Sequence, residues 1–172
     1  MATRAQPIVT LEARTSAHAE ALFAVLAEPA LYEFIEEYPP TSVELLRERF
    51  ARSESRRSLD GSQQWLNWVV KDESLNVAGY VQATVAADLQ THIAYMFGSA
   101  FQGRGIASAA VAQMLAIVAA EFGVTTFFVV AERKNSRSVR LAERLGFAEV
   151  SAEFAARQHT APHDVLLQKV RR

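Results

Sequence analysis

The residues whose types and spacing most clearly suggest a chemical role form the segment "FQGRGIASAAV", residues 101–111. In it, two glycines and an arginine precede an alanine-rich run. A strand that runs through a glycine-bearing turn into a helix leaves backbone N–H groups free at the positive end of the helix dipole. Glycine lets that backbone approach a phosphate closely, and Arg104 adds a positive charge beside it. The segment therefore indicates an anion site. Glycines kept only for close packing of the turn are the alternative.

Two known phosphate loops do not fit this segment. Gly98 to Gly103 match the glycine spacing of a P-loop, but Arg104 and Gly105 stand where a lysine and a magnesium-binding Ser or Thr belong. In a dinucleotide fingerprint, Ser108 would replace the third glycine, and the chain that follows is short for a doubly wound domain. The sequence therefore disfavours both nucleoside triphosphate chemistry and dinucleotide binding.

A third pattern fits. Gln102, Gly105 and Ala107 read Q-x-x-G-x-A. A second motif, "NSRSVRLAERLGF", begins at Asn135, and the residues between the two motifs are enough for one helix and one strand. These motifs resemble those of the GNAT superfamily of acetyl-CoA-dependent N-acetyltransferases. N-x-x-S with a terminal L-G-F resembles the branch that acetylates protein N-termini, the ribosomal-protein type. The resemblance implies an α/β (α+β) fold with a mixed, mostly antiparallel central sheet flanked by helices.

The resemblance also implies acetyl-CoA as co-substrate and no metal. It places the pyrophosphate on backbone amides of the glycine loop, and the pantetheine arm where the preceding strand separates from its neighbour near a bulge. An amide near Phe97 would then face the thioester oxygen. For Asn135, capping of its own helix is a compatible second role. The cofactor-binding residues that the resemblance implies are Tyr95, Phe97, Gly98, Gln102, Gly103, Arg104, Gly105, Ile106, Ala107 and Asn135.

The resemblance suggests a base and an acid for the transfer. Many relatives carry a carboxylate where His92 stands, and histidine titrates near neutrality, so His92 would take a proton from an ammonium through water. A packed or solvated strand histidine is the alternative. Ala142 occupies the position of the family's tyrosine acid, which excludes that residue, and Ser138 matches the serine of N-x-x-S. A first-turn serine bonded to its own backbone is the alternative for Ser138.

An acceptor site is suggested by "EPALYEFIEEYPP", which contains acidic and aromatic side chains but no basic residue. The family builds this site largely from the first two helices and their connection, so Glu33, Glu36 and Glu37 would attract a cationic amine. An acidic, solvated helix end is the alternative. A small amine and a peptide N-terminus are both compatible acceptors. A catalytically silent module of the same fold that senses acyl-CoA is the alternative to an enzyme.

Composition limits these expectations. Hydrophobic residues make up 50% of the 172, which suits a single domain over residues 1–172. The 18 basic and 19 acidic residues leave a net charge of -1, so we expect no binding to nucleic acid or to a membrane. The chain has no cysteine, which excludes disulfides and thiolate chemistry, and no segment typical of a signal peptide. We expect a cytoplasmic monomer or homodimer.

The elements that must position these residues follow from hydrophobic periodicity and turn signals. The pattern predicts one strand, two helices, three consecutive antiparallel strands, and then helix, strand, helix and two strands. The helix after the glycine loop is apolar almost all round, as in a helix packed on a sheet. The predicted strands are 7–14, 65–72, 76–86, 91–99, 125–132, 147–154 and 163–170. The predicted helices are 17–28, one from Thr41 or Ser42, 104–121, and one from Asn135 or Ser136 to Gly146.

Overall fold

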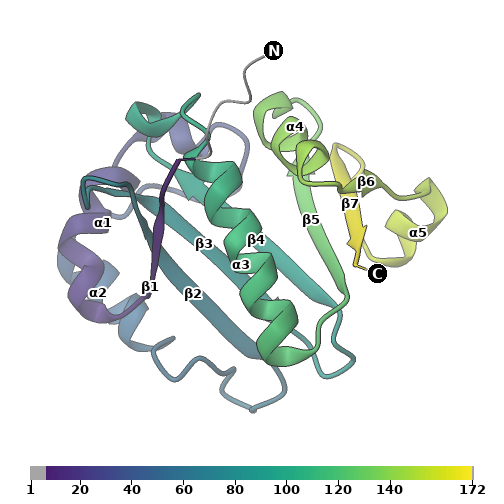
Figure 1. Ribbon diagram of the computed structural model, residues 1–172, viewed down its shortest axis with the longest axis horizontal. Helices are drawn as coiled ribbons and strands as arrows, with labels where there is room; N and C mark the ends of the chain where they lie inside the picture. Colours follow the sequence, from purple (N-terminus) through teal and green to yellow (C-terminus); the bar gives the residue numbers. More distant parts are fainter. Residues whose placement is uncertain (1–6, 172) are drawn as a thin grey trace.

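The computed structural model describes residues 7–171, in which one seven-stranded sheet carries helices on both faces (Figure 1). The predicted trio of antiparallel strands is present, and the mixed, mostly antiparallel architecture is confirmed. The one parallel pair joins β4 to β5 within the described sheet. The strands, in the order in which they lie side by side, are β1 (Thr10–Ala13), β2 (Gln64–Lys71), β3 (Val77–Val85), β4 (Thr91–Phe97), β5 (Thr126–Glu132), β7 (Asp164–Val170) and β6 (Ala148–Glu149).

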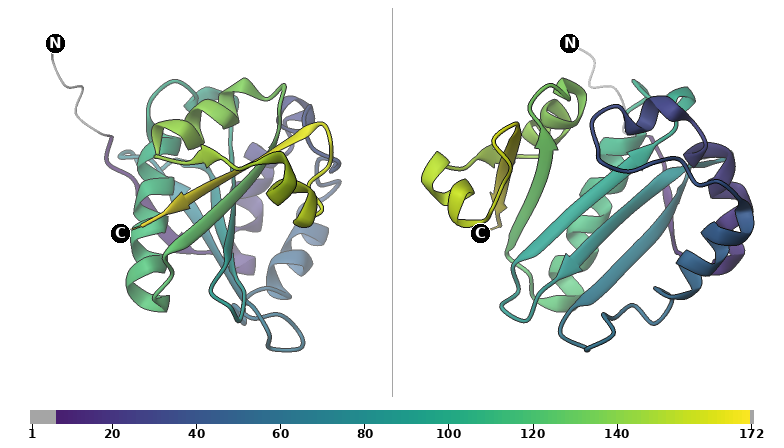
Figure 2. Two further views of the ribbon diagram at one scale, coloured as in Figure 1. Left: turned by 90° about the vertical axis from the view of Figure 1, so that its right-hand side faces the viewer. Right: turned by 180° about the vertical axis from the view of Figure 1, so that it is seen from behind.

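Alternation along the strands assigns the helices to opposite faces of the sheet. Val81 and Ile93 pack with helix α3 in one hydrophobic cluster, whereas Val69, Tyr80 and Met96 pack with helices α1 and α2 in another. Figure 1 shows α3 crossing in front of the sheet, and Figure 2 shows the face behind, with α1 and α2 toward its β1 edge. The helices are α1 (Ala19–Leu26), α2 (Val43–Ala51), α3 (Ile106–Phe122), α4 (Ser136–Arg144) and α5 (Ala152–Arg157), with short 3-10 turns η1 (Ser16–His18), η2 (Pro29–Tyr32) and η3 (Ser99–Phe101).

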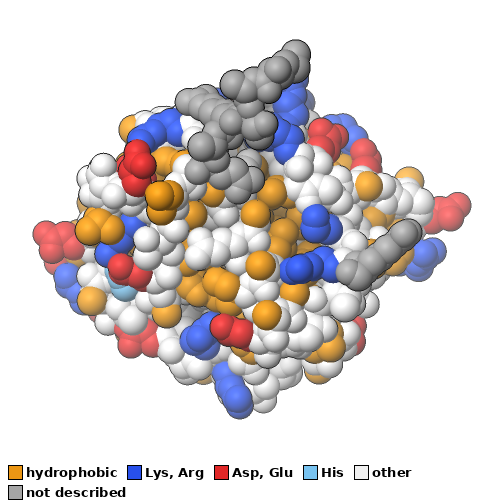
Figure 3. Space-filling view, viewed as in Figure 1, with side chains coloured by type: hydrophobic (Ala, Val, Ile, Leu, Met, Phe, Trp, Pro, Cys, Tyr) orange, Lys and Arg blue, Asp and Glu red, His pale blue; other side chains and the backbone are white. Residues whose placement is uncertain are grey.

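Helix α3 is the central buried helix that the sequence predicts. Its inner side contributes Ala110, Val111, Met114 and Val118 to the core, each of them fully buried. The outer side carries small or partly buried apolar residues, and in Figure 3 hydrophobic side chains cross the middle of the face where Figure 1 draws α3. The small alanines let the helix lie close to the strands. It therefore holds its first turn at a fixed place beside the end of β4.

The helix caps fix where α2 and α4 begin. Ser42, and not Thr41, caps α2 by accepting a hydrogen bond from the amide of Leu45 at 3.1 Å. Asn135, and not Ser136, caps α4, because its side chain accepts from the amide of Ser138 at 3.1 Å. Both caps satisfy an amide that the helix leaves without an intrahelical partner.

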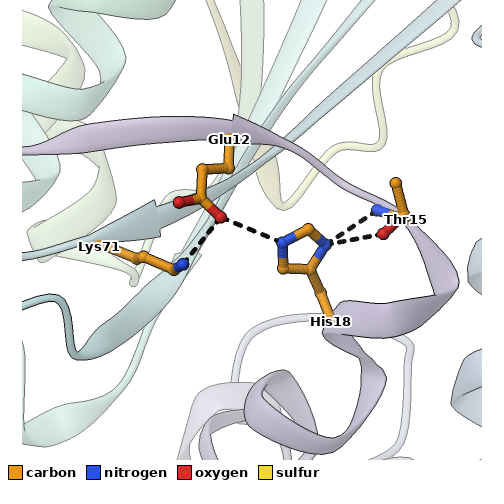
Figure 4. A network of polar contacts seen from close by, with 4 residues as sticks. All are labelled: Glu12, Thr15, His18 and Lys71. Carbon is orange, nitrogen blue, oxygen red and sulfur yellow. Dashed lines mark hydrogen bonds and ion pairs between the residues drawn. The ribbon is translucent and has the colours of Figure 1, made fainter.

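A polar network fixes the first strand to the start of α1 (Figure 4). The Glu12 carboxylate lies 2.8 Å from the Lys71 ammonium and 3.2 Å from Nε2 of His18. Nδ1 of the same ring accepts from the amide of Thr15 at 3.0 Å. The hydrogen bonds from Lys71 and then His18 hold the pKa of Glu12 below its ordinary value. The network therefore joins β1, β2 and the turn η1 into one unit.

The region after α4 differs from the prediction of a strand over 147–154. Strand β6 covers only Ala148–Glu149, and residues from Ala152 form the helix α5. The reason is local: Ser151 caps the new helix by accepting from the amide of Phe154 at 3.2 Å, and alanine-rich residues follow. Within residues 7–171, no helix combines the length and apolar character that crossing a bilayer requires.

Candidate active site

The two middle strands separate after a short parallel contact. β4 and β5 pair only at Thr91 with Phe127 and at His92 with Phe128. Beyond these pairs the second half of β5 loses its cover, and Val130 is 44% exposed although the sequence predicts a strand covered on both faces. The expected gap beside β4 is therefore present, and unpaired backbone lines it.

The backbone of β4 shows which amides face this gap. The amide of Gly98 donates to the carbonyl of Ala78 at 2.9 Å, in register with the β3–β4 pairs. Because antiparallel strands alternate the direction of their hydrogen-bonding groups, the N–H and C=O groups of Tyr95 and Phe97 point the other way, toward β5. An amide donor at Phe97 therefore faces the gap.

The bulge expected near this separation lies on the β2–β3 side of the sheet. The β3–β4 register runs without a shift, whereas the β2–β3 pairing shifts between Val70 and Lys71, next to Gly79. Gly79 lies opposite Phe97, and a Cβ built on it would be 2.0 Å from the Met96 carbonyl oxygen. The irregularity therefore lies in the pairing of β2 with β3, next to the end of β4. It requires a glycine at position 79.

A cleft of about 1120 Å³ occupies the gap and continues to both faces of the sheet. Its walls are β4 on one side and β5 with α4 on the other. One end reaches the glycine loop and the first turn of α3, and the other reaches the segment between η2 and α2. The cleft therefore connects a possible anion site to a possible acceptor site through the space between the strands.

The glycine loop presents amides to this cleft. Gly103 and Gly105 have left-handed backbones, with φ of +71° and +82°, and Gly105 is the N-cap of α3 without a side-chain hydrogen bond. The first turn of α3, which lies wholly within the described residues, contains no acidic side chain. Unpaired amides at a helix N-terminus attract an anion. Gln102, Gly103, Arg104, Gly105 and Ala107 line the cleft, whereas Ile106 is 2% exposed and turns into the core.

Positive charge surrounds the same end of the cleft. Lys134, Arg137 and Arg144 line it from α4 and the preceding turn, and basic side chains are visible around α4 in Figure 3. Nη1 of Arg137 donates to the side-chain oxygen of Gln102 at 2.5 Å, which joins the two walls. The Arg104 guanidinium lies 3.6 Å from the buried carboxylate of Asp72, so its charge is partly engaged outside the cleft.

Two hydroxyl groups meet across the cleft. The phenol oxygen of Tyr95 lies 3.0 Å from Oγ of Ser138 and donates toward the Ser138 carbonyl at 3.1 Å. Burial raises the pKa of Tyr95, while the hydrogen bond to Ser138 and the charge of Arg144 lower it. Tyr95, Phe97, Asn135 and Ser138 all line the cleft. Gly98 packs instead between α1 and the turn after it, since a Cβ there would meet Glu28 and Val25 at 3.1 and 3.2 Å.

His92 lies at the point where the strands part. Its ring stacks on Phe128 with centroids 5.4 Å apart, and burial lowers its pKa, which favours the neutral form. Among residues 7–171, His92 is not part of the cleft lining. It is five residues from Phe97, which corresponds to about 16 Å along an extended strand. The structure therefore does not bring His92 to the amide that faces the gap.

We expect His92→Ala to retain kcat within about threefold of the wild type, with an unchanged pH–rate profile, because no direct contact with a group at Phe97 is possible over that distance. Steady-state kinetics between pH 6 and 9 would measure this. A loss of more than tenfold, together with disappearance of a limb of the profile, would instead establish His92 as a base that acts through water.

The opposite end of the cleft carries the predicted acidic segment. Glu33 and Glu37 line it, whereas Glu36 does not. Glu37 lies 3.6 Å from Arg49, so its charge is partly balanced, and Glu33 is exposed. The segment is held to the end of β4 because the Glu28 carboxylate accepts from the amide of Ser99 at 3.1 Å. This arrangement leaves Glu33 as an exposed negative charge at this end of the cleft.

The prediction missed several lining residues. Tyr80 and Gln82 face the cleft from β3, and burial raises the pKa of Tyr80 to about 12. Their alternation with apolar residues in "VAGYVQATV" is a usable signal, since polar side chains on one face of a central strand indicate a face left open. The contact between Tyr95 and Ser138 joins residues 43 positions apart and has no sequence signal.

Comparison with known proteins agrees with this geometry. A family model described as an acetyltransferase (GNAT) domain matches residues 9–148. The chain belongs to the GNAT acetyltransferase family. This confirms the family assignment made from the Q-x-x-G-x-A and N-x-x-S motifs. A search of curated protein sequences finds no match.

Solved GNAT structures share the fold at low sequence identity. The ribosomal L7/L12 α-N-protein acetyltransferase RimL in complex with coenzyme A is 20% identical, over 94% of this chain and 93% of that one, with a TM-score of 0.76. Aminoglycoside acetyltransferase AAC(6')-Ib with coenzyme A is 17% identical over 95% of both chains, with a TM-score of 0.74. Spermidine N-acetyltransferase from Vibrio cholerae with CoA and spermine is 16% identical, over 93% and 92%, with a TM-score of 0.72.

Proposed function

We propose that this GNAT protein transfers the acetyl group of acetyl-CoA to a primary amine, on a small molecule or at a protein N-terminus, by direct attack in a ternary complex. The observation that carries the proposal is the parting of β4 and β5 into a cleft that joins the amides of the glycine loop to an acidic segment. Such a cleft can hold a long donor from one end and an amine from the other.

The donor would bind through backbone and charge. The amides from Gly103 to Ala107 suit the diphosphate, and the basic residues beside α4 suit its remaining charge. The pantetheine arm, itself a chain of amides, would pair with the unpaired backbone of Tyr95 and Phe97. The donor therefore needs few specific side chains, and the charge of Arg104 is shared with Asp72.

The chemistry would depend on an amide and a hydroxyl. The Phe97 N–H that faces the gap would donate to the thioester oxygen as negative charge develops there, and the loss of one such donor typically costs about 3 to 4 kcal/mol. Ser138, on the opposite wall, would donate a proton to the departing thiolate. The amine would approach from the acceptor end and lose its proton to water.

The acceptor is proposed to be a cationic amine, because Glu33 presents an exposed negative charge at its end of the cleft. A panel of diamines, polyamines, aminoglycosides and short peptides would be tested by release of free thiol from acetyl-CoA. We expect turnover, with the lowest KM for amines that carry a second positive charge. Tight CoA binding without turnover on any member would contradict an enzyme and fit an acyl-CoA sensor.

The same assay tests whether the acceptor is recognised by the charge of Glu33 itself or equally by any acidic residue of the segment. Glu33→Gln is expected to raise KM for a dicationic acceptor about threefold to fivefold, which is the size of one exposed charge interaction, with kcat unchanged. Glu36→Gln is the matched control, since Glu36 lies on the same segment outside the described cleft lining. Equal effects of the two changes would reject a specific role of Glu33.

A further inference from the structure

The contact between Tyr95 and Ser138 is the feature of the cleft that the proposed chemistry does not yet use. Tyr95 belongs to β4 and Ser138 to the first turn of α4, so the pair bridges the two walls between which the donor would pass. Phenol and hydroxyl lie 3.0 Å apart, within hydrogen-bonding distance. The Tyr95 ring packs against the main hydrophobic cluster, which fixes the phenol in place.

The hydrogen bonds of this pair have two arrangements. The phenol carries one proton and has two acceptors within reach, the Ser138 carbonyl at 3.1 Å and the Ser138 hydroxyl oxygen at 3.0 Å. When the phenol donates to the hydroxyl oxygen, the hydroxyl proton of Ser138 is left to point into the cleft. The phenol therefore controls whether Ser138 can donate to a group in the cleft.

The positive charge of Arg144 can stabilise a phenolate at Tyr95. Arg144 lies on the same helix as Ser138 and lines the cleft, and its charge lowers the pKa of Tyr95 against the larger effect of burial, which raises it. The helix offers no phenol of its own, because position 142 is an alanine that is 1% exposed and leaves no room for a ring. The only phenol beside Ser138 within the described residues is that of Tyr95.

We propose that Tyr95 is a positioning residue that acts through Ser138: it directs the Ser138 hydroxyl proton into the cleft and replaces that proton after transfer. The inference rests on the proposed function. As the carbon–sulfur bond breaks, its electron pair stays on sulfur, which takes the Ser138 proton. The Ser138 oxygen takes the phenol proton. The phenolate regains a proton from water. The attacking nitrogen, which is neutral before the attack, releases one proton to water as the amide forms, so the protons balance.

The first test is a double-mutant cycle in the thiol-release assay. Tyr95→Phe and Ser138→Ala are each expected to lower kcat about 100-fold, the scale of general acid catalysis, with KM for acetyl-CoA unchanged. The double variant is expected to lose no more than the single variants, because the two residues form one relay. Multiplicative losses, or a Tyr95→Phe variant within threefold of the wild type, would overturn the inference.

Two further measurements exclude a structural explanation. Tyr32→Phe is the matched control for stability, since the Tyr32 phenol also donates to a helix carbonyl, that of Leu26, at 2.9 Å, and we expect it to lower Tm as much as Tyr95→Phe does. Fluorinated tyrosines at position 95 lower the phenol pKa with little change of shape, so kcat should vary along the series. A constant kcat across the series would overturn the inference even if Tyr95→Phe failed to fold.

Failure of the proposed function is distinguishable from failure of this inference. Wild-type turnover of an amine reports on the function, and the ratio of variant to wild type reports on Tyr95. If the wild type accepts no amine, its slow hydrolysis of acetyl-CoA, in which water is the acceptor and the same thiolate departs, gives the same ratio. A ratio near one in that reaction would overturn the inference as well.

Discussion

A Gly103→Asp variant is expected to lose at least 100-fold in affinity for CoA while it remains folded. Gly103 has φ of +71°, and no atom lies within 4 Å of the position that a Cβ would take, so an aspartate fits there at a backbone cost of about 1 to 2 kcal/mol. Its carboxylate would occupy the amides that we assign to the diphosphate and would repel that group. A 100-fold loss corresponds to about 2.7 kcal/mol.

Gly123→Asp provides the matched control. Gly123 lies at the other end of the same helix, with φ of +69° and equally free space around it. Both variants therefore have the same backbone cost, and only one places a charge at the anion site. Calorimetric titration with CoA and thermal unfolding would separate binding from stability. Equal affinities of the two variants would remove the glycine loop from the binding site.

A Gly79→Ala variant is expected to lose at least 100-fold in kcat and about 5 to 10 °C in Tm. The added methyl group would lie 2.0 Å from the Met96 carbonyl oxygen and 2.8 Å from Cα of Phe97, so the end of β4 has to move. Overpacking of this kind costs about 1 to 3 kcal/mol, which is several degrees in a chain of this size. The amide of Phe97 would move with the strand, and a misplaced oxyanion donor lowers kcat steeply.

Gly61→Ala controls for an alanine at positive φ that meets no neighbouring atom. Gly61 has φ of +73° and nothing within 4 Å of its Cβ position, and it lies outside the cleft lining, in the loop before β2. We expect a small loss of Tm and unchanged kcat. If Gly79→Ala retained kcat while Tm fell, the position of the Phe97 amide would not matter for catalysis.

Much of the fold follows from local signals in the sequence. The starts of α2 and α4, the apolar helix α3 and the strand trio were predictable, because a periodic pattern meets an end signal in each. The caps Ser42 and Asn135 were narrowed to two neighbouring residues each. Helix α5 was not predictable, because the residues after Ser151 mix alanine with phenylalanine, and a short helix with a serine cap competes closely with a strand. Tertiary packing therefore decides between helix and strand for this segment.

The site was predictable where backbone forms it and unpredictable where side chains meet from distant elements. The glycine loop is continuous in sequence, so its residues could be identified from one motif. Ile106 belongs to that stretch and Gly98 precedes it, but the structure turns Ile106 into the core and packs Gly98 against α1. The pairing of Tyr95 with Ser138 depends on how α4 returns over the parted strands, which no local pattern encodes.

The structure also shows which charged residues near the cleft are paired with an opposite charge. Arg104 adjoins the glycine loop in sequence, yet its guanidinium is paired with Asp72 of the β2–β3 turn. Glu37 is partly balanced by Arg49, whereas Glu33 is exposed at the cleft. Spacing alone gives the location of a charge along the chain, and only the fold gives its partner. The acceptor test therefore uses Glu33 instead of the whole acidic segment.

The proposed acetyl transfer depends on one expected contact, between the diphosphate of the donor and the amides at the start of α3. The structure of the complex with acetyl-CoA tests it directly. We predict diphosphate oxygens within about 3 Å of the amides between Gly103 and Ala107, with the arm of the donor beside Tyr95 and Phe97 in the gap between β4 and β5. Acetyl-CoA bound elsewhere, with these amides in contact only with water at saturating ligand, would contradict the proposed function.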